Sequence, residues 1–164
     1  MKRSFLALII ACSQLLGQDR DLPGYKLAFE DNFDTLSVGP DTDKGSATWG
    51  NWLPYGPAGA FSRSHWAQWR LEVVDGVLRS NMVWNPNRQE DQSGNNWESG
   101  LIASMDKRRH GFAQRFGYWS ARIKMPNAGQ GAWSAFWLAS VSGIPNGPSK
   151  GYEVDILEAY GWQR

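Results

Sequence analysis

The sequence has little cysteine, little net charge and no long apolar run, and each shortage excludes a class of protein. Cys12 is the only cysteine among 164 residues, so an internal disulfide cannot form. The formal net charge is +1, which argues against nucleic acid or a strongly acidic surface as the main partner. The apolar run at 5–12 is too short to span a bilayer. Internal repeats and a glycine-rich phosphate-binding loop are also lacking.

The N-terminus, residues 1–17, has the pattern of an export signal, with two basic residues followed by the apolar run. Two processing schemes stay open. Ordinary cleavage would fall near Gly17, whereas the residues leading to Cys12 resemble a bacterial lipobox in which that cysteine becomes the lipidated first residue. We therefore expect a secreted or periplasmic protein, with a lipid anchor through Cys12 as the alternative.

Aromatic residues and turn formers are abundant. The chain contains ten Trp, five Tyr and seven Phe, together with 18 Gly and 8 Pro. This composition is typical of short strands joined by turns rather than of helices. At this length the chain forms one domain at most. We therefore predict an all-β domain, in which some indoles fill the core and others stack on sugars.

The most informative stretch is EVDILE near the C-terminus, which places three carboxylates within six residues. The β-branched residues between the acids favour a strand. Strict alternation would put Glu153 and Asp155 on one face and Glu158 on the opposite, core face. A buried and unpaired carboxylate is costly. We therefore predict a β-bulge, near Ile156 or Leu157, that returns Glu158 to the acidic face.

Three carboxylates in a row have a use in glycoside hydrolysis, which needs two carboxyl groups flanking the scissile bond. A third carboxylate between them repels both and raises the pKa of a neighbour. Two other interpretations stay open. The acids could simply be a solvated strand face, or they could bind calcium, although an extended strand does not wrap an ion as a loop does.

Residues 132–139 form a second informative strand. Trp133 and Trp137 share one face of it, and Phe136 and Leu138 share the other. The two indoles then lie roughly 13 Å apart by strand rise. If the second pair faces the core, the indoles form the floor of a groove beside the acidic strand and suit the apolar faces of sugars. The alternative is that both indoles belong to the core.

Further strands are expected from alternation and turn signals. They span residues 25–33, 69–74, 77–84, 97–104 and 116–125. Asp75-Gly76 predicts a two-residue hairpin turn. The aromatic segment 49–69 is expected to be a loop over one end of a cleft, and the basic segment 106–110 a solvated turn.

Four segments together resemble glycoside hydrolase family 16. EVDILE resembles the E-x-D-x-x-E signature of that family in its bulged, laminarinase-like form. The other similar segments are YKLAFEDNFD at 25–34, GYWSARIKMP at 117–126 and GAWSAFWL at 131–138. Ser134 stands where the family usually has proline. The resemblance covers roughly residues 25–160.

The resemblance implies an antiparallel β-sandwich, a concanavalin-A-like jelly roll with a cleft across its concave sheet, formed by residues 25–164. By matching motif positions, Glu153 would be the nucleophile and Glu158 the general acid/base of a retaining endo-glycosidase. Asp155 would orient the nucleophile and tune the pair. Both indoles, Trp133 and Trp137, would bind the substrate.

The implied partner is a β-linked polysaccharide, and the bulged spacing favours β-1,3-glucan over the mixed-linkage substrates of unbulged relatives. Agarases and other galactan hydrolases share related motifs. The mechanism requires no cofactor, although a structural calcium ion can bind near the first strand, where Glu30, Asp31 and Asp34 lie. We expect a monomer.

The chain stops at Arg164, six residues after Glu158, whereas the sandwich of the family continues through several more strands. We expect either a fragment of a longer protein or a degraded copy. Two other functions therefore remain open. One is a carbohydrate-binding module that uses Trp133 and Trp137 without turnover, and the other is an inactive, truncated hydrolase.

Overall fold

The computed structural model describes residues 22–40, 43–51, 64–87, 96–127, 129, 131–143 and 151–161. The predicted export signal with Cys12 lies outside these ranges, as do Trp52, Tyr55 and Phe61 of the aromatic segment. Within the described ranges, regular structure consists of strands and two single-turn 3-10 helices. This confirms the all-β prediction. In the same ranges, none of the helices has the length and apolar character needed to cross a membrane.

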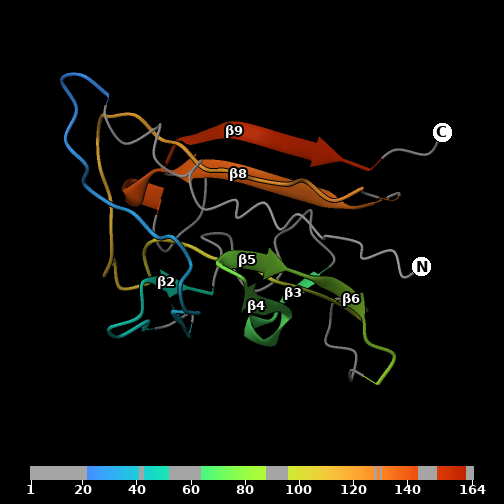
Figure 1. Ribbon diagram of the computed structural model, residues 1–164. Coiled ribbons are helices and arrows are strands. Elements are labelled where there is room, and N and C mark those ends of the chain that lie inside the picture. The colour runs from blue at the N-terminus through green and yellow to red at the C-terminus, as the bar shows by residue number, and fades with distance from the viewer. Residues whose placement is uncertain are drawn as a thin grey trace, which may run out of the picture.

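The strands are short apart from the last two (Figure 1). They are β1 (Val38–Gly39), β2 (Trp49–Gly50), β3 (Ser64–Trp66), β4 (Leu71–Val74), β5 (Val77–Ser80), β6 (Met82–Trp84), β7 (Trp97–Ser99), β8 (Trp133–Ala139) and β9 (Glu153–Tyr160). The 3-10 helices are η1 (Gln68–Arg70) and η2 (Val141–Gly143).

The strands pair in four small sheets. β4 and β5 form the predicted antiparallel hairpin, whose turn residues Asp75 and Gly76 have φ angles of 52° and 69°. Positive φ at both central positions is what a type I′ turn requires. β6 pairs antiparallel with β7, and β7 pairs parallel with β3. β1 and β2 also pair in parallel, so two short pairs depart from the antiparallel prediction.

Two predicted strands, 25–33 and 116–125, do not form. Both segments alternate apolar and polar residues, but neither belongs to a ladder within the described residues. Alternation alone does not make a strand, because the hydrogen bonds of a strand come from a neighbour. The ring of Phe116 is 79% exposed. Two other predictions were right in type and wrong in extent, since η1 occupies the start of 69–74 and β7 ends at Ser99.

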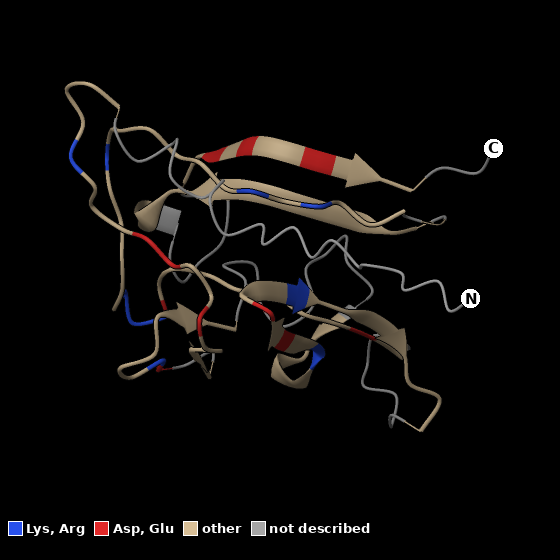
Figure 2. Ribbon diagram, viewed as in Figure 1, with Lys and Arg blue, Asp and Glu red and all other residues tan. Residues whose placement is uncertain are grey.

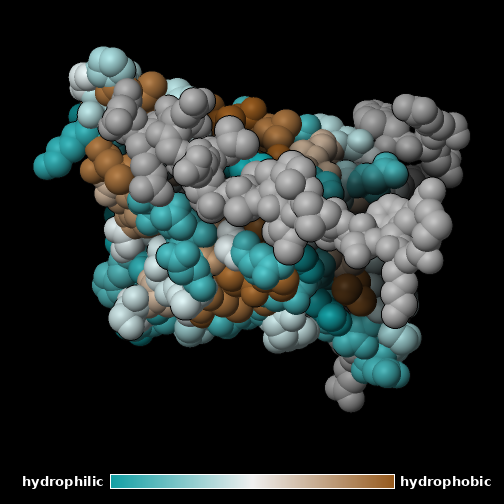
Figure 3. Space-filling view, in the orientation of Figure 1, coloured by the Kyte–Doolittle hydropathy of each residue, from teal (hydrophilic) through white to brown (hydrophobic). Residues whose placement is uncertain are grey.

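The buried apolar core of the described residues is small. It consists of Ala67, Leu71 and Met105. Apolar side chains reach the surface in several patches (Figure 3). Hydrophobic burial therefore contributes less here than in a closed sandwich, and hydrogen-bonded polar groups determine much of the local structure.

Candidate active site

β8 and β9 form an antiparallel ribbon whose register shifts once. Phe136 pairs with Leu157, but the next residue, Trp137, pairs with Asp155. Ile156 is therefore an extra residue on β9, which is the geometry of a β-bulge. The predicted bulge is confirmed at one of the two positions that the sequence indicated.

The bulge gives the carboxylates a common face. Directly opposed residues of an antiparallel ladder point the same way, and alternate residues of β8 share a face. The opposed pairs on this face are Glu153–Ala139, Asp155–Trp137, Glu158–Ala135 and Tyr160–Trp133. All three predicted acids and both predicted indoles therefore lie on one face of the ribbon, where acidic residues recur along β9 (Figure 2). Each glutamate stands opposite an alanine, whose small side chain leaves room above the carboxylate.

The pKa of the Glu153 carboxyl group is raised. The largest cause is partial desolvation of its carboxyl group. The negative charges of Asp155 and Glu158 add to it, and so does a hydrogen bond between Glu153 and Asp155. Because two carboxylates cannot hydrogen-bond to each other without a proton, that bond favours the protonated form of Glu153.

Both carboxylate oxygens of Glu158 accept a hydrogen bond. The indole N–H of Trp133 donates to Oε1 at 2.8 Å, and the hydroxyl of Tyr160 donates to Oε2 at 2.8 Å. The rings of Trp133 and Tyr160 also pack on each other, with centroids 5.1 Å apart. Sequence reasoning missed Tyr160. Its signal was its position two residues beyond Glu158, on the same side of a regular strand.

A hollow of about 200 Å³ opens at this end of the ribbon. It is lined by Gly131, Ala132, Trp133, Tyr160 and Gly161. Trp133 and Tyr160 are each about half exposed, so flat aromatic surface faces the solvent directly beside the Glu158 carboxylate. Exposed aromatic faces of this kind suit the apolar C–H face of a sugar ring.

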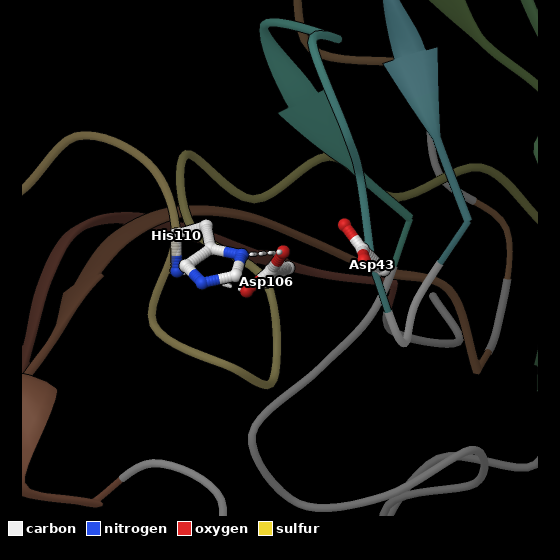
Figure 4. A group of neighbouring side chains, drawn as sticks. All are labelled: Asp43, Asp106 and His110. Carbon is white, nitrogen blue, oxygen red and sulfur yellow. Dashed lines mark hydrogen bonds and ion pairs between the residues drawn. The ribbon is translucent and has the colours of Figure 1, made fainter.

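A second group of potential ligands lies away from the ribbon. Ligand atoms of Asp43, Asp106 and His110 all lie within 4.8 Å of one another (Figure 4). Each is already engaged within the protein. Asp106 accepts the backbone N–H groups of Lys44, Arg108 and His110 at 2.9–3.2 Å. Asp43 accepts the guanidinium of Arg108 at 2.8 Å. The arrangement serves to join two loops.

Asp106 is fully buried. Burial pushes its pKa up, but the N–H groups of His110, Lys44 and Arg108 outweigh burial, and the net pKa is lowered. The segment 106–110 is therefore a turn organised around a buried carboxylate, and the prediction of a solvated turn was wrong for this residue. Asp31, within the region proposed for calcium, accepts the indole N–H of Trp49 at 2.6 Å.

Glu98 on β7 is a buried acid, with an exposed fraction of 2%. Its carboxylate accepts hydrogen bonds from Arg70, Trp69 and Asn85. The shortest, from Arg70 Nη2, is 2.6 Å. The Asn85 bond is the main cause of a pKa lowered to about 2, while burial opposes it and the bonds from Trp69 and Arg70 contribute further. Sequence reasoning did not identify this network.

Comparisons with known proteins agree with the geometry of the ribbon. The model of the family described as glycosyl hydrolases family 16 matches residues 78–164, just over half of the chain. A curated relative, Endo-1,3-1,4-beta-glycanase EglC of Rhizobium meliloti (strain 1021), is 29% identical over 158 residues. That match covers 81% of this chain but 29% of the relative, so the chain spans less than a third of the relative's length. No solved structure matches significantly.

Proposed function

Because this chain belongs to glycosyl hydrolase family 16, we propose that it carries the catalytic strand of a retaining endo-glycosidase that acts on a β-linked glucan. The observation that carries the proposal is the bulged β9 strand, which aligns three carboxylates on one face beside two indoles. The all-β architecture is consistent with the jelly-roll sandwich of the family. We propose the following roles for the individual residues.

Glu153 is the nucleophile in this proposal. Its carboxylate attacks the anomeric carbon and forms a glycosyl-enzyme, while Glu158 protonates the departing oxygen. Glu158 then removes a proton from the water that hydrolyses the intermediate, so the anomeric configuration is retained. The carboxyl groups of a retaining enzyme lie about 5–5.5 Å apart. The mechanism therefore requires the two glutamate side chains to lean toward each other, over the alanines Ala135 and Ala139 that stand opposite them.

Asp155 lies between them and tunes the pair. Besides partial desolvation, its charge and its hydrogen bond raise the pKa of Glu153, and they thereby set the pH above which the nucleophile is ionised. Trp137 stands directly opposite Asp155, and Trp133 stands four residues away on the same face. The two indoles offer stacking surfaces for sugar rings along the face that carries the carboxylates. Substrate binding by Trp133 and Trp137 is part of the proposal.

We propose a glucan with β-1,3 linkages as the substrate, because the bulged E-x-D-x-x-E spacing is the laminarinase-like form. The printed name of the relative, a 1,3-1,4-beta-glycanase, supports a substrate that contains such linkages and adds mixed-linkage glucan as the second candidate. The mechanism uses carboxyl groups alone and requires no cofactor. A structural calcium ion near Asp31, export of the protein and a monomeric state remain predictions.

The decisive experiment replaces Glu153 with Gln, which keeps the shape of the side chain and removes the charge. The 164-residue chain and the variant are assayed for reducing ends on β-1,3-glucan, mixed-linkage β-1,3-1,4-glucan, β-1,4-glucan and agarose. We expect a loss of at least about a thousandfold in turnover, since removing a nucleophile eliminates the covalent route. The anomer that forms first, followed by NMR, should be the retained β form.

Glu72→Gln is the matched control, because Glu72 is an exposed acid on β4, away from the ribbon. Its turnover should equal that of the unaltered chain. Circular dichroism of both variants checks that the fold is kept. Unchanged turnover in Glu153→Gln would overturn the role of Glu153, and an inverted first product would overturn the two-step mechanism.

A non-catalytic carbohydrate-binding role is the second candidate, and the two indoles on one face favour it. It requires that the unaltered chain binds glucan without releasing reducing ends. Binding should then persist when Glu153 and Glu158 are both changed to Gln. Titration calorimetry with a soluble β-glucan oligosaccharide separates this outcome from that of an inactive, truncated hydrolase, which neither binds nor cleaves.

A further inference from the structure

The two donors to Glu158 differ in what their chemistry allows. The indole N–H of Trp133 is a donor only, whereas the hydroxyl of Tyr160 can donate or accept. Oε1, which faces the indole, must therefore remain an acceptor in every protonation state of the carboxyl group. Oε2, which faces the hydroxyl, can exchange its role with Tyr160 by rotation of the O–H bond.

From this asymmetry we propose that Tyr160 is a positioning residue for Glu158, and that Oε2 is the oxygen that carries the acid proton. In the ionised state, Tyr160 donates to Oε2. When Glu158 is protonated, the O–H of Tyr160 turns away and leaves the proton on Oε2 free to reach the departing sugar oxygen. The inference rests on the proposed function, since it assigns the proton of the same general acid.

The local packing holds Tyr160 in place for this role. Tyr160 is the residue directly opposed to Trp133 in the β8–β9 ladder, and the two rings are tilted by 38° at a centroid distance of 5.1 Å. Their hydroxyl and N–H groups reach the same carboxylate from two sides. Glu158 is thus fixed by a closed triangle of contacts, which reduces the number of side-chain conformations that it can adopt.

The hollow beside this triangle is a place where the group that accepts the proton could bind. Trp133 and Tyr160 both line it, so a sugar bound there lies next to Oε1 and Oε2 of Glu158. The general acid protonates the oxygen of the leaving group. The hollow is therefore the place where we expect the leaving-group sugar to sit, on the opposite side of Glu158 from Glu153.

One test of the contact needs no enzymatic activity. The neighbouring carboxylate raises the pKa of Tyr160, mainly through their hydrogen bond and further through its charge. We therefore expect a late transition, above the ordinary range of a tyrosine, in an ultraviolet titration. Tyr160→Phe should remove this late transition, and Glu158→Gln should move it to lower pH. A titration unaffected by Glu158→Gln would overturn the proposal.

The second test separates positioning of the acid from a general structural effect. A poor leaving group such as a sugar needs the acid, whereas an aryl glycoside with an activated phenolate leaving group does not. Tyr160→Phe keeps the ring packed on Trp133 and removes only the hydroxyl. We expect kcat/KM to fall about tenfold on the polysaccharide and to stay within about twofold on the activated glycoside.

Tyr152→Phe is the matched control, because Tyr152 is 87% exposed just before β9. It should leave the late transition of Tyr160 and kcat/KM unchanged. An equal loss on both substrates in Tyr160→Phe would mean that the hydroxyl is structural, and would overturn the proposal. If the unaltered chain cleaves neither substrate, the proposed function fails, and the tyrosine titration still decides whether Tyr160 holds Glu158.

Discussion

Two acidic residues of the molecule, Glu98 and Glu153, have pKa values that are shifted in opposite directions by their surroundings. Glu98 is buried and surrounded by donors from Arg70, Trp69 and Asn85, and its pKa is lowered to about 2. Glu153 lies on an open strand beside two further carboxylates, and its pKa is raised. Donors stabilise the ionised form of a carboxyl group, while neighbouring negative charges destabilise it.

The difference separates an acid that stabilises the fold from the acids for which we propose a role in catalysis. A carboxylate that is ionised at every ordinary pH is a permanent hydrogen-bond acceptor, and Glu98 joins η1, β7 and the end of β6 in this way. A carboxyl group whose pKa is shifted by burial and by neighbouring charges marks a candidate functional site. The ribbon of β8 and β9 supplies such charges, since its two strands contain three acids and no basic residue.

After the loss of turnover in Glu153→Gln, the largest expected effect is a loss of stability in Glu98→Gln. Glu98→Gln leaves the guanidinium of Arg70 without its anionic partner in a buried site. We expect a loss of about 3 kcal/mol in the free energy of unfolding, measured by urea denaturation. Glu72→Gln, at an exposed site on β4, should change it by less than about 0.5 kcal/mol. A loss below about 1 kcal/mol for Glu98→Gln would contradict the role of this network.

The same network predicts an acid limit of stability. The pKa of Glu98 falls from its ordinary value of 4.5 to about 2 on folding, so the folded state binds its proton less tightly than the unfolded state. Its contribution, on the order of 3 kcal/mol, is complete above about pH 4.5 and is lost as the pH falls toward about 2. The acid-induced loss of stability should be smaller in Glu98→Gln.

A somewhat smaller effect is expected at the second buried acid, Asp106. Both of its oxygens accept backbone N–H groups. Asp106→Asn replaces one carboxylate oxygen with an NH2 group, which then faces a backbone N–H donor. We expect a loss of about 1–3 kcal/mol in the free energy of unfolding. Asp75→Asn is the control, because asparagine tolerates the left-handed conformation of that turn residue. Equal stability of the two variants would break the analogy between Asp106 and Glu98.

The smallest expected effect concerns Glu153, the acid whose pKa is raised. Asp155→Asn removes a charge and a proton acceptor that both raise the pKa of Glu153. Because the nucleophile must be ionised, the acid limb of the pH profile of kcat/KM should move to lower pH. Glu72→Gln should leave that limb in place. A shift to higher pH would mean that Asp155 stabilises the ionised form of Glu153 instead.

The acidic strand shows how far sequence reasoning reached. β-Branched residues between acids predicted a strand, and the cost of a buried Glu158 predicted a bulge, which lies at Ile156. Both conclusions depend on local properties, namely side-chain shape and the two-residue period of a strand. The Asp75-Gly76 turn was predictable for the same reason, since it needs only two residues that tolerate positive φ.

The segments 25–33 and 116–125 show where that reasoning failed. Each has the alternation of a strand, yet strand structure requires a partner, and the identity of a partner is not a local property. The sequence did not predict the networks around Glu98 and Asp106 for a related reason. Sequence does not reveal that Arg70 and Asn85 converge on Glu98, or that the backbone of Lys44 reaches Asp106.

Sequence by itself determined the class of the fold, the strand that carries the three acids and the need for a bulge within it, because these follow from covalent geometry and short-range periodicity. Only the tertiary structure decided which residues stand opposite those acids. The register of β8 against β9 puts alanines over the two glutamates and brings Trp133 and Tyr160 to Glu158. Apart from the contact between Tyr160 and Glu158, which both lie on β9, these contacts cross from one strand to the other, and packing in three dimensions selects them.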